Sequence, residues 1–132
     1  MGAWGTRNFE NDGSQDWIFD LMDNKDAGMV SDTLARVLNN NENLEISDCE
    51  EALAAAEVVA ALAGKPSEDI PEDPLDTLDV LNIIVTSSLR QQAIATVQKI
   101  QTASEMKAQW EDQGQAEAWN GVLNNLVQRL KI

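Results

Sequence analysis

The residues of this sequence that could carry out chemistry are almost all carboxylates. The best acidic trio is Glu10, Asp12 and Asp16, just ahead of and within a predicted helix start. An acid–base pair needs two environments that push the carboxyl pKa values apart, and nothing in the sequence points to such a pair. Helix capping, in which a carboxylate favours the positive end of the helix dipole, explains the trio more simply. We therefore predict no catalytic residues and no enzymatic activity, and we assign Glu10 and Asp12 a structural role.

Cysteine and histidine chemistry is also unsupported. The chain has no histidine, so the commonest general base and metal ligand is missing. Its one cysteine, Cys49, cannot form an intramolecular disulfide, and the neighbouring acids oppose a reactive thiolate. The sequence contains no zinc-ligand spacing, serine elbow or nucleotide-binding loop. These observations predict a structural cysteine, no metal site and no cofactor.

The charge is strongly segregated along the chain. Residues 1–80 contain 19 Asp and Glu against 4 Lys and Arg, whereas residues 81–132 contain 4 against 5, giving the total of −14. A directional negative field steers a basic partner and repels nucleic acid and anionic lipid, although a solvated acidic face is the simpler interpretation. We take a basic protein as the hypothetical partner, with neither nucleic acid nor membrane. The proposed partner-binding residues are Asp16, Asp20, Asp23, Asp26, Glu68, Asp69, Glu72 and Asp73.

Three functions are compatible with these patterns. The first is a small interaction module of the inhibitor or immunity type that binds a basic protein. The second is a structural or assembly module that forms a homo-oligomer. The third, which the absence of a catalytic constellation makes the weakest, is a carboxylate-dependent enzyme.

Length and composition indicate a single domain spanning residues 1–132. A chain of 14.5 kDa can bury an ordinary hydrophobic core without disulfides or metals. No stretch approaches the length of about 18 apolar residues that a membrane span requires, and the N-terminus lacks a signal-peptide pattern. With a single cysteine, the expected compartment is the reducing cytoplasm.

The first half of the chain predicts three helices. The first begins after a cap at Asp12 or Ser14 and fades near Asn24, and the second starts near Ser31 and ends in the asparagines at 39–41. The third starts with a capping box formed by Ser47 and Glu50. Residues 52–63 of this third helix are apolar except for Glu57, which predicts a buried central helix that Gly64 terminates.

A proline-rich acidic linker at residues 65–76 separates the two halves. Three prolines in nine residues predict a stiff, extended and exposed segment. Its carboxylates have no ordered cation-binding spacing. From Leu75 a helix resumes, and the run Ile83–Val85 is expected to lie deep. Residues 75–104 form either two helices broken near 86–88 or one long kinked helix.

The last part of the chain predicts two further helices. Ser104 caps a short helix that ends at Gly114, and the stripe from Trp119 to Leu130 gives the final helix. No strand-like alternation is present. The predicted fold is all-α, an irregular bundle of six to seven helices with an N-terminal extended strap.

Large apolar residues at both ends of the chain are expected to anchor this bundle. The strap carries Trp4 and Phe9, and a terminal segment retains such residues when it docks on the body. Gly2 and Gly5 mark turns or close approaches of the backbone. The full set of predicted structural anchors is Trp4, Phe9, Glu10, Asp12, Trp17, Ser47, Glu50, Trp110 and Trp119.

The opening Met-Gly-Ala-Trp-Gly-Thr, followed by Phe-Glu-Asn-Asp at residues 9–12 and Asp16-Trp17, resembles a bacterial family catalogued as domain-of-unknown-function family 4259. Residues 50–66, and residues 104–111 with 117–119, are similar to the same family, so the likeness covers nearly the whole chain. Arg7 departs from the glycine usual at that position, and a residue with a side chain disfavours a tight turn there. The resemblance implies a fold and no established activity.

Overall fold

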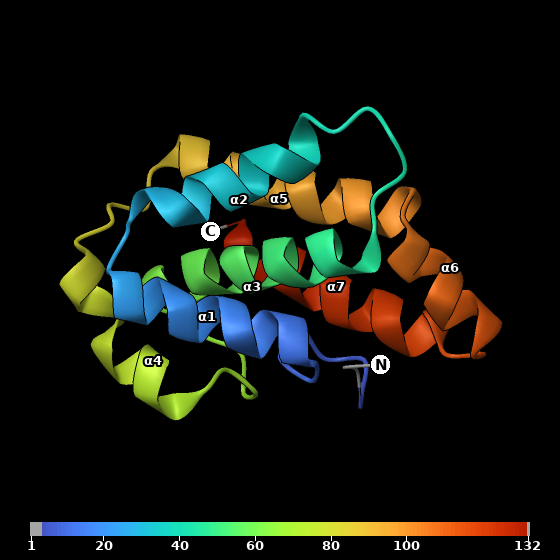
Figure 1. Cartoon of the computed structure of the whole chain (residues 1–132), viewed down its shortest axis with the longest axis horizontal. Coiled ribbons are helices and arrows are strands. Elements are labelled where there is room, and N and C mark those ends of the chain that lie inside the picture. Colours follow the sequence, from blue (N-terminus) through green and yellow to red (C-terminus); the bar gives the residue numbers. More distant parts are fainter. Residues whose placement is uncertain (1–3, 132) are drawn as a thin grey trace.

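The protein is a bundle of helices joined by short loops (Figure 1). This computed structural model describes residues 4–131, and it contains no β-strand within that range. The all-α prediction is confirmed. The elements are α1 Asp12–Asn24, α2 Gly28–Leu38, α3 Ile46–Leu62, α4 Glu72–Thr77, the 3-10 helix η1 Leu78–Leu81, α5 Ser87–Thr102, α6 Glu105–Asp112 and α7 Ala116–Leu130.

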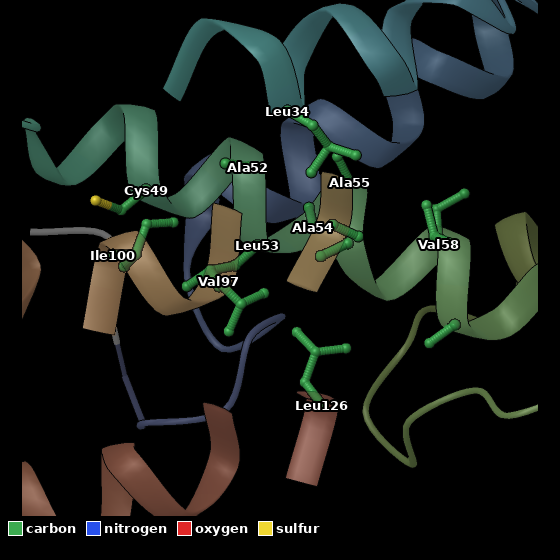
Figure 2. Close-up of a cluster of buried hydrophobic side chains, with 14 of the residues drawn as sticks. Leu34, Cys49, Ala52, Leu53, Ala54, Ala55, Val58, Val97, Ile100 and Leu126 are labelled. Atoms are coloured by element: carbon green, nitrogen blue, oxygen red, sulfur yellow. The ribbon is translucent and has the colours of Figure 1, made fainter. Parts of the chain in front are cut away.

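Helix α3 is the central element, as the sequence predicts. It packs against α1, α2, α5 and α7, and it runs through the middle of the molecule in Figure 1. Residues 52–60 are all buried because small side chains, mainly alanines, let the neighbouring helices approach from every side. Figure 2 shows Leu34 of α2 on one side of α3, with Val97 of α5 and Leu126 of α7 on the other.

Two helices end at the predicted glycines, each in a left-handed conformation that favours glycine. Gly64 has φ +89° and Gly114 has φ +71°. At the end of α3, Lys65 N donates to Ala60 O at 2.9 Å, and at the end of α6, Gln115 N donates to Trp110 O at 2.9 Å. These bonds satisfy carbonyl groups that would otherwise have no intrahelical partner.

The start of α1 differs from the prediction. The N-cap is Asn11, whose Oδ1 accepts a hydrogen bond from Ser14 N at 2.7 Å. Asp12 and Ser14, the predicted caps, therefore occupy the first turn. Asparagine caps as well as aspartate does, and the cap falls where the preceding backbone is extended.

The starts of α2 and α3 also differ from the prediction. Helix α2 begins at Gly28, one turn before the predicted Ser31. Helix α3 begins at Ile46, its N-cap Glu45 makes no side-chain capping bond, and the capping box predicted at Ser47 and Glu50 is wrong. Because the helix starts earlier, Ser47 already lies within its first turn.

The proline-rich segment is partly helical rather than extended, and it packs on the body through a few residues while its acidic side chains are mostly exposed. Pro71 precedes α4, and Pro74 lies in its first turn, where a missing N–H removes no helical hydrogen bond. Ile70 and Pro74 are buried. The predicted extended conformation is wrong for residues 72–76, because Pro71 and Pro74 occupy only the N-cap and the first turn of α4.

Residues 75–104 do not form one kinked helix. The chain leaves η1 through Asn82, which has φ +54°, and Thr86 then caps α5 by accepting a hydrogen bond from Leu89 N at 3.0 Å. The run Ile83–Val85, predicted to lie deep, forms this connection instead. Ile84 is 80% exposed, because helical spacing does not apply to a segment outside a helix.

The predicted anchors are divided between core and surface. Phe9, Trp17, Trp110 and Trp119 are buried, and Trp17 Nε1 donates to Thr33 Oγ1 at 3.1 Å. The docking predicted for Trp4 is wrong, since this residue is 62% exposed.

The segment that joins Trp4 to α1 follows bends and turns, in which Trp4 N donates to Glu10 O at 2.8 Å. The close approach predicted at Gly5 is present, because a Cβ there would collide with the Glu10 carboxylate. The prediction for Gly2 falls outside the described residues.

Enlarging an alanine of α3 tests the close packing. Ala55→Leu should lower the free energy of unfolding by about 1–3 kcal/mol, because Ala55 is fully buried and added methyl groups force neighbouring side chains out of their rotamers. Urea unfolding measures the change. The matched control is Ala95→Leu on the exposed face of α5, which should change stability by less than about 0.5 kcal/mol. Equal effects of the two substitutions would contradict the packing described for α3.

Candidate functional site

A charged side chain lies in the middle of the most apolar helix. Glu57 is only 1% exposed, and its neighbours along α3 are alanines and valines. A buried carboxylate is very costly unless charged and hydrogen-bonding groups surround it. The structure supplies these groups from two distant parts of the chain.

Arg129 of α7 forms a two-pronged ion pair with Glu57. Its Nη1 donates to Glu57 Oε1 at 2.8 Å, and its Nη2 donates to Oε2 at 3.0 Å. The same guanidinium donates to Lys65 O at 3.1 Å and, through Nε, to Asn125 Oδ1 at 2.8 Å. Four donations hold the arginine in place, and its rigid fork makes it better suited than lysine to this role.

The segment that precedes α1 completes the network. Asn8 Nδ2 donates to Glu57 Oε2 at 2.7 Å. The next residue, Phe9, donates its backbone N–H to Asp69 Oδ2 at 2.9 Å. The opening segment is therefore tied to α3 and to the segment between α3 and α4, and each tie fixes a polar group that the core would otherwise leave without a partner.

A cleft of about 510 Å³ opens over this network. Its walls come from the opening segment, from the chain after α3 and from α7. Both small apolar residues and charged groups line it. The residues that line the cleft are Arg7, Glu57, Pro66, Ser67, Glu68, Asp69, Ala118, Gly121, Val122, Asn125 and Arg129.

Three of the predicted partner-binding acids share one surface. Asp16, Asp20 and Asp23 are exposed on α1, and their spacing places them on the side opposite the buried Ile18 and Leu21. Of the four ion pairs found among the described residues, none involves these three carboxylates. The structure thus brings them together as a helix face without neutralising them.

An exposed aromatic ring lies on the same face of α1. Phe19 is 44% exposed, and it follows Asp16 by three residues and precedes Asp23 by four. Residues three and four apart are neighbours on a helix surface, so the ring lies among these carboxylates. We call Asp16, Phe19, Asp20 and Asp23 the α1 face.

The remaining predicted acids are placed differently. Asp26 accepts a hydrogen bond from Gly28 N at 3.0 Å, and Asp69 accepts one from Phe9 N, so both have structural roles. Glu68 lies 4.0 Å from Arg7 at the edge of the cleft.

Glu72 and Asp73 are exposed in the first turn of α4, which packs beside α1 (Figure 1). These two exposed acids therefore lie on a helix that neighbours α1.

Glu50 is a half-buried carboxylate at the crossing of α1 and α3. Its side chain fills the space above Gly13, where a Cβ would collide with its carboxylate. Burial, followed by the nearby Asp12 and Glu51 carboxylates, raises the pKa of Glu50 above its ordinary value. Glu50 therefore packs against Gly13 and does not take part in the capping box predicted with Ser47.

The cysteine is buried and poorly suited to chemistry. Burial raises the pKa of the Cys49 thiol to about 12, although a hydrogen bond with Ser104 acts in the opposite direction. Along residues 4–131, no three His, Cys, Asp or Glu side chains gather into a group that could hold a metal ion. None of the helices in this range has the length and apolarity to cross a membrane.

Sequence reasoning missed the two most informative features. Glu57 was visible as the one charged interruption of an apolar helix, but no local pattern identifies a partner 72 residues away. Phe19 was visible as a large apolar residue off the buried stripe of α1, a signal that points to an exposed contact residue.

Removing one partner of the buried ion pair should be strongly destabilising. Arg129→Leu is expected to lower the free energy of unfolding by about 3–5 kcal/mol, because it leaves Glu57 buried without its counter-charge. The double variant with Glu57→Leu should recover part of that loss. Chemical denaturation gives both values, and the exposed pair Arg36–Glu51 is the control, worth about 0–1 kcal/mol. Additive losses in the Glu57–Arg129 double variant would contradict the coupling.

The raised pKa of Glu50 predicts a pH-dependent effect of Glu50→Gln. Because the pKa of Glu50 is higher in the folded state than its unfolded value of 4.5, the protonated side chain is favourable to folding at low pH. This favourable contribution is lost as the pH rises through the folded-state pKa. At pH 7 the charged Glu50 is unfavourable, so Glu50→Gln should raise the urea midpoint there. The difference should disappear below about pH 4. Glu42→Gln in an exposed loop is the control, and a pH-independent gain at Glu50 would contradict the assignment.

Comparison with known proteins gives one match. Residues 2–121 match the model of a family described as Domain of unknown function (DUF4259). No curated protein and no solved structure matches the chain. The match covers nearly the whole sequence, so the chain belongs to this family.

Proposed function

We propose that this member of the DUF4259 family is a protein-interaction module of the inhibitor or immunity type that binds a basic protein through the α1 face. In this proposal the module acts in the cytoplasm and binds without catalysing a reaction. The observation that carries it is Phe19, an exposed aromatic ring surrounded by carboxylates that have no ion-pair partner among residues 4–131.

The two components of the α1 face would act at different stages of binding. Uncompensated carboxylates raise the rate of encounter with a positively charged surface and disfavour wrong partners. An aromatic side chain supplies contact area at low conformational cost, and such residues often carry most of the binding energy. A face with both features suits a basic partner that presents an apolar or cationic group to the ring.

The charge of the α1 face argues against its use in self-association. A two-fold interface brings the same patch of both copies together, so Asp16, Asp20 and Asp23 would meet their own equivalents. A second candidate function, assembly into a homo-oligomer, is instead favoured by the exposed Val80 and Ile84 after α4. Size-exclusion chromatography with light scattering separates the candidates, since a monomer at high concentration removes the second.

Capture from the native host followed by affinity measurement tests the interaction module. The wild-type protein should retain a basic protein at low salt, and the triple variant D16N/D20N/D23N should bind it about tenfold more weakly. This loss should shrink at higher salt because exposed charges are screened. Phe19→Ser should weaken binding about tenfold or more at either salt concentration, since it removes contact area rather than charge.

The matched control removes three exposed acids from the other end of the chain, in α6 and α7. It should bind the partner as the wild type does if the α1 face is the docking surface. Equal losses in both triple variants would show a general charge effect and contradict the proposal. The control substitutions are Glu105→Gln, Asp112→Asn and Glu117→Gln.

A further inference from the structure

We propose that the cleft between the opening segment, residues 66–69 and α7 receives an arginine side chain of the basic partner. The inference rests on the proposed function for the origin of this side chain. The cleft lies apart from the α1 face, and we expect it to bind both the charged group and the aliphatic stem of this arginine.

The charge of the cleft favours a cationic guest. Arg7 and Arg129 contribute two positive charges, and Glu57, Glu68 and Asp69 contribute three negative ones. The Glu57 carboxylate is fully engaged by Arg129 and Asn8. One positive charge would therefore make the cleft neutral, whereas an anion would add to the excess.

Acceptor atoms without partners lie on one wall. Asp69 uses only Oδ2 to bind Phe9 N, which leaves Oδ1 without a hydrogen bond among the described residues. Ser67 Oγ is shielded from solvent and has no partner in the same part of the chain. A guanidinium carries five donors in a rigid fork and can serve more than one acceptor at once. Of these two atoms only the Ser67 hydroxyl is buried, and a donor group placed in the cleft would satisfy it.

The small apolar residues of the cleft suit an aliphatic stem. Pro66, Ala118 and Val122 provide a small apolar surface. Long basic side chains bury their methylene groups along apolar surface while their charged ends remain hydrated or paired. The cleft thus offers separate surfaces for the two parts of an arginine.

Gly121 keeps the cleft open. It lies within α7, where glycine is unfavourable relative to alanine, and a Cβ at this position would meet no atom within 4 Å. The packing of the bundle therefore does not require glycine here. The space that its missing side chain leaves belongs to the cleft, which a larger residue at this position would fill.

NMR titration of the full chain tests the inference with N-acetyl-arginine amide as the probe. Shifts should concentrate at residues 66–69 and 118–125 and should saturate at millimolar concentration. N-acetyl-citrulline amide has nearly the same shape without the charge, and it should bind at least tenfold more weakly. Gly121→Leu, on an exposed helix face, should fold normally and abolish the shifts.

A further double variant separates charge from shape. Glu68→Gln with Asp69→Asn should weaken binding of the arginine probe at least tenfold, and the asparagine retains an oxygen for Phe9 N. If this variant does not fold, Gly121→Leu alone decides. Equal binding of the arginine and citrulline probes, shifts outside the cleft, or wild-type binding by Gly121→Leu would overturn the inference.

The proposed function and this inference fail separately. The α1 triple variant D16N/D20N/D23N should bind the arginine probe as the wild type does, because its substitutions lie outside the cleft. If the probe does not bind but that variant loses the protein partner, the cleft assignment falls and the interaction module stands. If the probe binds in the cleft and no basic protein is captured, the arginine site remains and the interaction module falls.

Discussion

The buried pair of Glu57 and Arg129 is the interaction on which the rest of the structure depends. It joins α3 to α7 across the core, and Asn8 and Lys65 extend it to the opening segment and to the chain after α3. A charge in such a position stabilises little by itself, because desolvation offsets the Coulomb attraction. The pair disfavours other arrangements of the opening segment, α3, the chain after α3 and α7. An arrangement that separates them would leave a carboxylate or a guanidinium buried without its partner. The pair also forms the floor of the cleft, so the element that specifies the packing also shapes the candidate binding pocket.

Around this pair, α3 organises the bundle because most of its buried side chains are small. Its alanines allow α1, α2, α5 and α7 to approach closely, and those neighbours supply many of the larger side chains of the core, such as Leu34, Ile100 and Leu126 (Figure 2). Elsewhere the helices are joined by polar contacts at their ends. The Lys99 ammonium on α5 donates to the carbonyls of Val37 and Leu38 in the last turn of α2 and to that of Asn40 just after it, where a cation also complements the helix dipole. The helices are therefore held together by apolar packing at the centre of the bundle and by polar contacts at their ends.

The acidic character of the protein has more than one structural origin. Some carboxylates hold the fold, as Asp26 and Asp69 do by accepting backbone N–H groups and as Glu57 does in the core. Others, such as those of the α1 face, have no ion pair among the described residues, and they surround an exposed aromatic ring. Net charge alone does not distinguish these groups. The distinction matters for function, because only a carboxylate oxygen without a structural partner is available to another molecule, as in the α1 face or at Oδ1 of Asp69.

The sequence by itself determined the helical class, the central position of α3, the glycine ends at Gly64 and Gly114, and the segregation of charge. The charge segregation is a matter of composition, and the other features follow from patterns within a few residues, such as helical periodicity or the conformational freedom of glycine. Only the tertiary structure decided that Glu57 meets Arg129, that Trp4 and Ile84 are exposed, and that Asp69 is structural while Asp16 is not. These outcomes depend on which distant segments come together, and burial or pairing of a side chain is a property of that arrangement rather than of its neighbours in the chain. The cleft has the same origin, since its walls come from three segments that no local pattern relates.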